Sequence, residues 1–132
     1  MSVIEAQQAH DSTNAAYCKV QVRFMLGDAI ALGTGKAELL AAIAETGSIA
    51  AAGRKMGMSY RRAWLLVETM NQCFCEPLVI STKGGKHGGG AQLSALGEQV
   101  LALFGQMLAQ IQQHTITQQQ ELLALLKNQT QT

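Results

Sequence analysis

The pattern of hydrophobic and polar residues first predicts a strand. Between Cys18 and Leu26 apolar residues alternate with polar ones, so that Val20, Val22 and Phe24 share one side. An alternation of this kind is typical of a half-buried strand, and Gly27-Asp28 is a turn signal that closes it.

At Thr34 the spacing changes to that of amphipathic helices. Three short helices are predicted, from Thr34 to Gly47, from Ile49 to Met56 and from Tyr60 to about Cys73. Apolar residues three and four apart mark the first of them: Leu39, Leu40, Ile43 and Ala44. Ser48 and Ser59 are suited to cap the second and third helices, and glycines separate all three. The second helix is rich in alanine, which lets another helix approach closely.

After Pro77, which must end the third helix, the pattern predicts a hairpin. Leu78–Thr82 is a short apolar strand, Lys83–Gly90 is a glycine-rich loop, and Ala91–Ser94 is the returning strand. Such a hairpin after three helices would form a wing.

The last part of the chain is predicted to be a long helical arm. It begins at Ser94 or Ala95, and a further short helix follows a hinge near Thr115, with a capping box from Thr117 to Gln120. An apolar stripe along the long helix needs a partner to cover it. Its residues are Leu96, Val100, Leu103, Phe104, Met107 and Ile111.

The composition is that of one globular domain with an appendage. The chain has 132 residues, 48% of them hydrophobic, and lacks any apolar run of the ~20 residues that cross a membrane. Residues 1–16 lack the basic start and apolar stretch of a secretory signal. We expect a cytoplasmic protein with a flexible tail at 1–16, a domain at 17–94 and a helical arm at 95–132.

The cysteines Cys18, Cys73 and Cys75 are an odd number in a chain without an export signal. We therefore expect free thiols and no disulfide framework. Cys73 and Cys75 could form a redox switch or half of a metal site, but no second cluster follows at the spacing of zinc ligands. Buried or neutral cysteines are the favoured interpretation, and no metal is predicted.

The net charge is only +1, but basic residues are concentrated in the middle of the chain. Residues 54–87 contain six basic and two acidic residues, whereas acidic residues exceed basic ones on both sides of this stretch. Only the surface that faces DNA has to be basic, so this distribution is compatible with a DNA-binding protein.

The order of elements predicts a winged helix-turn-helix. The second and third helices sharpen this prediction, because a capped helix, a glycine turn and a second capped helix follow within about fourteen residues. The predicted fold is mainly α, with an N-terminal strand, a β-hairpin wing and a long C-terminal dimerisation helix.

The third helix has two different sides. On a helical wheel Ala63, Val67, Met70 and Phe74 lie opposite Arg61, Arg62, Leu65 and Thr69. Trp64 falls at the edge of the packed side and is assigned to the core. Arg61 and Arg62 lie in the first turn, where each could bind a guanine through two hydrogen bonds or hold a phosphate.

The glycine-rich loop also favours contact with DNA. Five glycines expose backbone N–H groups and permit close approach to phosphates: Gly84, Gly85, Gly88, Gly89 and Gly90. Lys83 and Lys86 add charge, as suits a wing laid on the DNA backbone or in the minor groove. A flexible loop without a ligand is the alternative.

Two stretches resemble the N-terminal DNA-binding domain of the ModE family of molybdate-responsive regulators, relatives of the LysR-type helix-turn-helix. They read GTGKAELLAAIAETGSIAAAGRKMGMSYRRAWLLVETMN and GGKHGGGAQLSALGEQVL. The elements GSI, SY-x-x-AW, MN and GGK-x-GGGA-x-L occur in order and at similar spacing, which makes the resemblance specific.

The resemblance implies a homodimer on a palindromic operator, with the first strand and last helix at the subunit interface. It places Ser59, Tyr60, Arg61 and Arg62 at the start of the reading helix and Lys83–Gly90 in the wing. Full-length members carry β-barrel modules that bind molybdate, and no such module is visible before the chain ends. We therefore expect a stand-alone DNA-binding form, for which molybdate enters only by family analogy and another regulatory protein could supply the signal.

These arguments predict contacts with double-stranded DNA at Ser48, Ser59, Tyr60, Arg61, Arg62, Leu65, Lys83, Lys86 and His87. An enzyme is one alternative, since Gly33–Lys36 has some likeness to a phosphate-binding loop. That match fails, because Ile30 stands where the first glycine should be and Ala37 replaces the hydroxyl residue. The histidines have no catalytic partners at recognisable spacing, so no enzyme is predicted. The other alternative is a protein-interaction module that docks through its last helix and binds no DNA.

Overall fold

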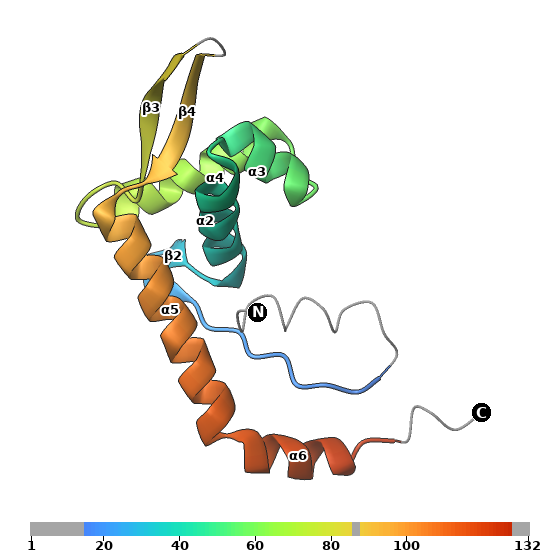
Figure 1. The fold of residues 1–132 in the computed structure, drawn as a ribbon. Coiled ribbons are helices and arrows are strands. Elements are labelled where there is room, and N and C mark those ends of the chain that lie inside the picture. Colours follow the sequence, from blue (N-terminus) through green and yellow to red (C-terminus); the bar gives the residue numbers. More distant parts are fainter. Residues whose placement is uncertain (1–14, 86–87, 128–132) are drawn as a thin grey trace. The chain divides into compact units, whose positions relative to one another are not determined.

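The computed structural model describes residues 15–85 and 88–127, with backbone only at 83–85, 88 and 89. Figure 1 shows its elements: β1 (Phe24–Leu26), β2 (Ala29–Leu32), α2 (Thr34–Thr46), α3 (Ile49–Lys55), α4 (Tyr60–Cys73), β3 (Val79–Gly85), β4 (Gly88–Leu93), α5 (Ala95–His114) and α6 (Ile116–Ala124). This order confirms the prediction of a mainly α winged helix-turn-helix. None of the described helices is both long and apolar enough to span a membrane.

Contacts divide the chain into two compact units. One comprises Val22–Leu103, and the other combines Met1–Gln21 with Phe104–Thr132. The first unit contains the helix-turn-helix and the wing, and the second contains α6 and the C-terminal part of α5. The boundary falls within α5, so the two units are described separately.

The first sheet is an antiparallel hairpin in which β1 pairs with β2. Gly27 forms the turn with a φ of 60°, in a region that glycine adopts without steric cost. The prediction of one strand from Cys18 is wrong, because β1 begins only at Phe24 and the sequence pattern does not reveal β2. A strand needs a partner for its backbone N–H and C=O groups, and β2 has only four residues to offer.

The alternation predicted from Lys19 to Arg23 holds, because Val20 and Val22 are half-buried and the polar residues among them are exposed. Phe24, predicted on the buried side, is instead 46% exposed. The pairing register shifts between Phe24 and Met25, so the regular alternation does not extend through β1. All three residues of β1 are exposed.

The turns between the three helices have the predicted chemistry. Gly47 and Gly57 adopt the left-handed conformation, with φ of 74° and 73°. The Ser48 hydroxyl oxygen accepts a hydrogen bond from the N–H three residues on at 3.0 Å, and that of Ser59 accepts the equivalent bond at 3.1 Å. Both serines are therefore N-caps, as predicted.

The core of the larger unit lies where α2, α3 and α4 pack together (Figure 1). A Cβ on Gly53 would lie 3.3 Å from the Cβ of Ala63, so small residues do allow α3 and α4 to approach closely. Ala44, predicted on the apolar side of α2, is exposed. The largest fully buried side chains of this unit are Leu39, Leu40, Ile43, Met70 and Leu78.

The wing is longer than predicted. Strands β3 and β4 pair from Val79 opposite Leu93 to Gly85 opposite Gly88, with an irregular register after Thr82. The prediction of a loop over Lys83–Gly90 is therefore wrong for most of its length, and only Lys86-His87 lies outside the described residues. Glycine is disfavoured in strands. Its backbone N–H and C=O groups nevertheless form hydrogen bonds as well as those of other residues once the hairpin brings the two strands opposite each other.

The base of the wing is fixed to the turn between α2 and α3. The Ala91 N–H donates to the carbonyl oxygen of Gly47 at 2.9 Å. A Cβ on Gly90 would lie 2.5 Å from the same oxygen. Only glycine at position 90 therefore allows β4 to come this close.

The other strand of the wing is fixed by Asn71, near the end of α4. Its Oδ1 accepts the N–H groups of Leu78 and Val79 at 2.8 and 3.2 Å, and its Nδ2 donates to the Val79 carbonyl oxygen at 3.1 Å. One amide side chain thus satisfies three backbone groups where the chain leaves α4 for β3.

Helix α5 begins as predicted, with Ser94 before its first residue. The Ser94 hydroxyl oxygen accepts the Gly97 N–H at 3.0 Å and can donate to the Pro77 carbonyl oxygen at 2.6 Å. A Cβ on Gly97 would lie only 2.1 Å from the carbonyl oxygen of Leu78. The first turn of α5 therefore touches backbone, and no side chain fits there.

In the smaller unit, α5 and α6 meet at Thr115, which confirms the predicted hinge and the further helix. The predicted capping box at Thr117 is wrong, because α6 begins at Ile116 and Thr115 holds the N-cap position without a side-chain cap. The Thr115 hydroxyl instead donates to the Ile111 carbonyl oxygen at 2.5 Å and accepts from Nε2 of Gln119 at 2.9 Å. Gln119, only 7% exposed, occupies the inner side of the bend.

Two glycines of α5 should respond to alanine in opposite ways. Gly97→Ala should lower the free energy of unfolding by roughly 2–3 kcal/mol, because the new methyl group meets backbone that cannot move aside. Gly105→Ala should raise it by about 1 kcal/mol, because a Cβ there has no neighbour within 4 Å and alanine favours helix. Urea denaturation of both variants checks the prediction, and changes of the same sign would contradict it.

Candidate nucleic-acid interface

Helix α4 presents one packed and one open side. Ala63, Val67 and Met70 are 0%, 4% and 0% exposed, as the wheel predicts. Phe74, assigned to the same side, follows the last residue of the helix and is only half-buried. The packed side therefore extends over about two turns and holds the helix in place.

The open side carries most of the predicted reading residues. Tyr60, Arg61, Arg62 and Leu65 are all exposed. Thr69, expected among them, is half-buried, and its hydroxyl donates to the Leu65 carbonyl oxygen at 3.0 Å. The first two turns of α4 are thus free on this side in the described structure.

The prediction that Trp64 belongs to the core is wrong. The helical wheel places it at the edge of the packed side, but it is 42% exposed. Each residue advances a helix by about 100°, so Trp64 turns away from Ala63 and lies one turn beyond Arg61. Arg61, Trp64 and Leu65 together form what we call the reading face, and Glu68, half-buried, follows one turn later.

A basic cluster lies next to α4, and the sequence pattern does not predict it. It consists of Arg23, Lys36 in the first turn of α2, and Arg62 in the first turn of α4. Burial lowers the pKa of Lys36 below its ordinary value of 10.5, and Arg23 and Arg62 lower it further, while Cys73 acts in the opposite direction. None of the three takes part in the ion pair that the structure describes, which joins Lys55 and Glu45. The three residues are far apart along the chain, so only the fold brings their charges together.

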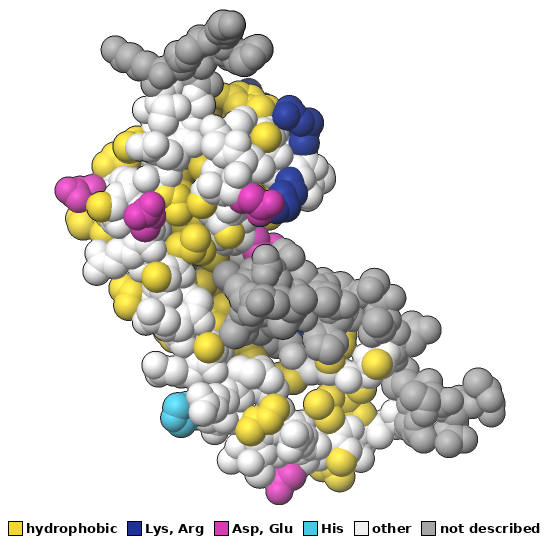
Figure 2. All heavy atoms as spheres, in the orientation of Figure 1, with side chains coloured by type: hydrophobic (Ala, Val, Ile, Leu, Met, Phe, Trp, Pro, Cys, Tyr) yellow, Lys and Arg dark blue, Asp and Glu magenta, His cyan; other side chains and the backbone are white. Residues whose placement is uncertain are grey.

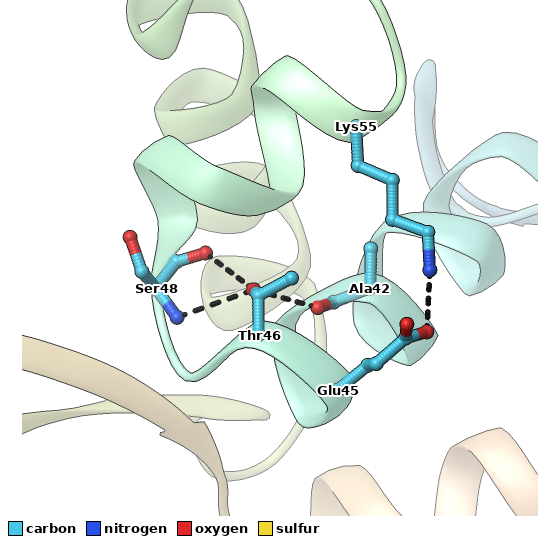
Figure 3. Close-up of polar contacts among 5 residues, drawn as sticks. All are labelled: Ala42, Glu45, Thr46, Ser48 and Lys55. Carbon is cyan, nitrogen blue, oxygen red and sulfur yellow. Dashed lines mark hydrogen bonds and ion pairs between the residues drawn. The ribbon is translucent and has the colours of Figure 1, made fainter.

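The basic residues on α3 are in a different situation. Figure 2 shows basic side chains beside an acidic one over this helix. Lys55 forms an ion pair with Glu45 of α2 (Figure 3). Where α2 ends and the turn to α3 begins, the Thr46 hydroxyl lies 2.8 Å from the carbonyl oxygen of Ala42 and 3.1 Å from that of Ser48. The charge of Lys55 is therefore compensated, which makes the basic cluster the more available site for an anion.

The tip of the wing is the part of the predicted interface that lies outside the described structure. Lys86 and His87 lie outside the described residues. Only the backbone is described for Lys83, Gly84, Gly85, Gly88 and Gly89. Gly90 is described, and it contacts the turn at Gly47. Figure 1 shows β3 and β4 extending away from α2, α3 and α4 within the larger unit.

The apolar stripe of α5 is partly covered by the chain itself. Val100 and Phe104 are 9% and 2% exposed, and Leu96, Met107 and Ile111 are half-buried. Leu103 alone among the stripe residues is exposed, at 55%. Leu103 is thus open and three other stripe residues are partly open, and the expectation that a partner covers the stripe stays a prediction.

The cysteines are free thiols, as predicted. Cys18 and Cys75 are exposed and Cys73 is half-buried, so neither Cys18 nor Cys75 is buried, and the interpretation of cysteines without a special function stays a prediction. Among the described residues no three His, Cys, Asp or Glu side chains are grouped as metal ligands would be.

No family model matches the chain, but several curated proteins are similar to it. The molybdenum-pterin-binding protein MopB of Rhodobacter capsulatus is 47% identical over 74 residues. The molybdenum transport protein ModE of Azotobacter vinelandii is 40% identical over 74 residues. The DNA-binding transcriptional dual regulator ModE of Escherichia coli K12 is 44% identical over 75 residues.

These matches take in 56–57% of this chain but only 27–28% of each relative. The chain therefore corresponds to little more than a quarter of their length. None of the three names describes an enzyme. The identity over this stretch, together with the winged helix-turn-helix fold, shows that the matched part of the chain is similar to a domain of ModE and MopB.

Proposed function

We propose that this chain is a transcriptional regulator that binds a palindromic operator as a homodimer. The observation that carries the proposal is the free side of α4, where Arg61 stands on a helix whose opposite side is fully packed. A helix held in this way can enter the major groove without rearrangement. It is preceded by a capped turn and flanked by a hairpin, the arrangement in which winged-helix proteins contact DNA.

The two arginines of the first turn have different roles in this proposal. Arg61 lies at the centre of the reading face and binds a base edge, with guanine as the base that suits a bidentate arginine. Arg62 lies at the side of the helix, within electrostatic reach of Lys36, and binds a phosphate together with the basic cluster. A phosphate between these cations would offset the repulsion among them.

The wing would lie on the DNA backbone or in the minor groove. Its predicted contacts, Lys83, Lys86 and His87, are assigned from the sequence and from the resemblance. The hydrogen bonds of Asn71 and the Gly47 carbonyl oxygen support this role, because they fix the base of the hairpin relative to α4. Ser48 and Ser59 would contribute as N-caps, with helix N-termini that favour nearby phosphates.

We place the dimer interface on the arm at 95–132, where Leu103 is exposed, and on the exposed strand β1. The DNA-binding domain would comprise residues 17–94, preceded by a tail at 1–16. Two recognition helices in such a dimer would lie about 34 Å apart, one turn of DNA. A regulator of this kind acts in the cytoplasm and needs no catalytic group.

Molybdenum enters the proposal only through the names of the relatives, which include a molybdenum-pterin-binding protein and a molybdenum transport protein. No residue of this chain is assigned to molybdate. A second regulatory protein is the other source of a signal.

Selection of bound sequences from a random DNA pool, followed by a salt titration, tests DNA binding directly. The logarithm of the association constant should fall steeply and linearly with the logarithm of the salt concentration. Binding that is absent, or insensitive to salt, would favour a protein-interaction module instead.

Arginine variants test the division of roles on the selected operator. Arg61→Ala should cost about 1–3 kcal/mol and relax the preference at one base pair of each half-site. Arg62→Ala should weaken binding to all sequences alike and reduce the salt slope by about 1 for each phosphate that the variant no longer neutralises. An equal reduction in affinity across sequences in the Arg61→Ala variant would reassign it to a phosphate.

The dimer is tested by a charge at Leu103. Leu103→Glu should shift the chain toward monomers in sedimentation experiments and weaken operator binding, because a carboxylate cannot be buried unpaired in an apolar interface. Ala102→Glu is the matched control, since Ala102 is also exposed on α5, and it should leave the dimer intact. A dimer that tolerates glutamate at position 103 would place the interface elsewhere.

The Lys36→Met variant should be more stable than the wild type but bind the operator less tightly. Removing a half-buried charge should raise the free energy of unfolding by roughly 0.5 kcal/mol near neutral pH, while operator affinity and the salt slope decrease. Because the folded pKa lies below 10.5, the folded state loses this proton first, and wild-type stability should approach that of the variant as pH rises toward 10.5. Denaturation of both proteins between pH 8 and 10.5 measures the difference, and a gap that does not narrow would contradict the assignment.

A further inference from the structure

The open side of α4 is apolar as well as basic. Tyr60, Trp64 and Leu65 are 57%, 42% and 46% exposed, and all lie in its first two turns. Trp64 and Leu65 stand three and four residues after Arg61, so they flank it one turn further along the helix. Single exposed apolar residues are common, but three large ones beside one arginine form a patch that a ligand would cover.

We propose that Leu65, with Trp64 beside it, recognises thymine in the operator by contacting the C5-methyl group. This inference rests on the proposed function, since it requires α4 in the major groove. The thymine methyl is the apolar group that base pairs present there. Leu65 carries no hydrogen-bonding group, so what it can recognise in the groove is a hydrocarbon surface.

The charges around the patch favour DNA over an apolar protein partner. Arg61 lies one turn before Trp64 and Leu65 on the same side of the helix. A hydrophobic protein surface that covered this patch would bury the Arg61 guanidinium without a hydrogen-bond acceptor, at a high cost in free energy. The major groove offers both kinds of contact within neighbouring base pairs, since guanine O6 and N7 accept hydrogen bonds and thymine supplies the methyl group. The basic cluster at the side of the helix meets the phosphates that border the groove.

The test replaces thymine by deoxyuridine, which removes the methyl group and keeps every hydrogen-bonding group. The full chain is first used to select an operator from a random pool, and each thymine is then replaced, one position at a time. At one or two positions per half-site, wild-type affinity should fall about three- to fivefold for each methyl removed. Replacement in both half-sites together should lower it roughly tenfold or more.

Leu65→Ala should bind the thymine and uracil operators with equal affinity at the position that Leu65 contacts. Trp64→Ala should reduce the preference at a neighbouring position. Leu122→Ala is the control for this ratio, because Leu122 is a 66% exposed leucine on α6. Since α6 belongs to the arm assigned to the dimer interface, this variant can change the overall affinity, but its ratio of affinities for thymine and uracil should equal that of wild type. Thermal unfolding confirms that the variants are folded.

The possible failures are distinguishable. If no sequence is enriched and no salt-dependent binding is found, the proposed function and this inference both fail. If an operator is bound but deoxyuridine has no effect, thymine recognition by methyl contact is wrong and DNA binding stands. If the preference for thymine survives unchanged in Leu65→Ala and in Trp64→Ala, the methyl group is read by another part of the chain and the assignment to this face is wrong.

Discussion

The carbonyl oxygen of Gly47 joins the wing to the helix-turn-helix in the larger unit. Gly47 ends α2 in a left-handed conformation that side chains rarely adopt, and Ser48 then starts α3. The same carbonyl oxygen accepts the Ala91 N–H from β4, so the wing is tied to the turn of the helix-turn-helix. Gly90 must lack a side chain for this contact to form. This contact between the wing and the helices therefore depends on two glycines and one hydrogen bond.

The second anchor is at the far end of α4. Asn71 bonds three backbone groups at the start of β3, and Ser94 and Gly97 bring α5 against the carbonyl oxygen of Leu78. Helix α4 is thus fixed along its packed side and at the end where the wing begins. In the described part of the chain, its first two turns have exposed side chains on the open side. A helix that is packed on one side and exposed on the other is suited to present side chains to a rigid partner. It loses little further conformational entropy on binding, because packing already holds it in place.

Like charges of the larger unit lie close together and lower its stability by repelling one another. Arg23 and Arg62 lower the pKa of Lys36, and none of the three takes part in the described ion pair, which joins Lys55 on α3 to Glu45. A basic cluster beside an exposed helix is expected where an anionic ligand supplies the compensating charge. In the described structure Trp64 and Leu65 of the reading face are also exposed, although tryptophan and leucine side chains are more often covered.

Local patterns in the sequence determined the three helices and their caps, the hinge at Thr115 and the two sides of α4. Each of these depends on residues within a few positions of one another: a serine before a helix, a glycine after it, apolar residues three and four apart. Tertiary structure decided the rest. Four features depend on which segments pack against one another in the folded chain. They are the short pairing of β1 with β2, the strand conformation of the glycine-rich stretch, the exposure of Trp64, and the grouping of Arg23 with Lys36 and Arg62. Hydrophobic periodicity records which face of an element is apolar, but only packing determines whether another segment covers that face.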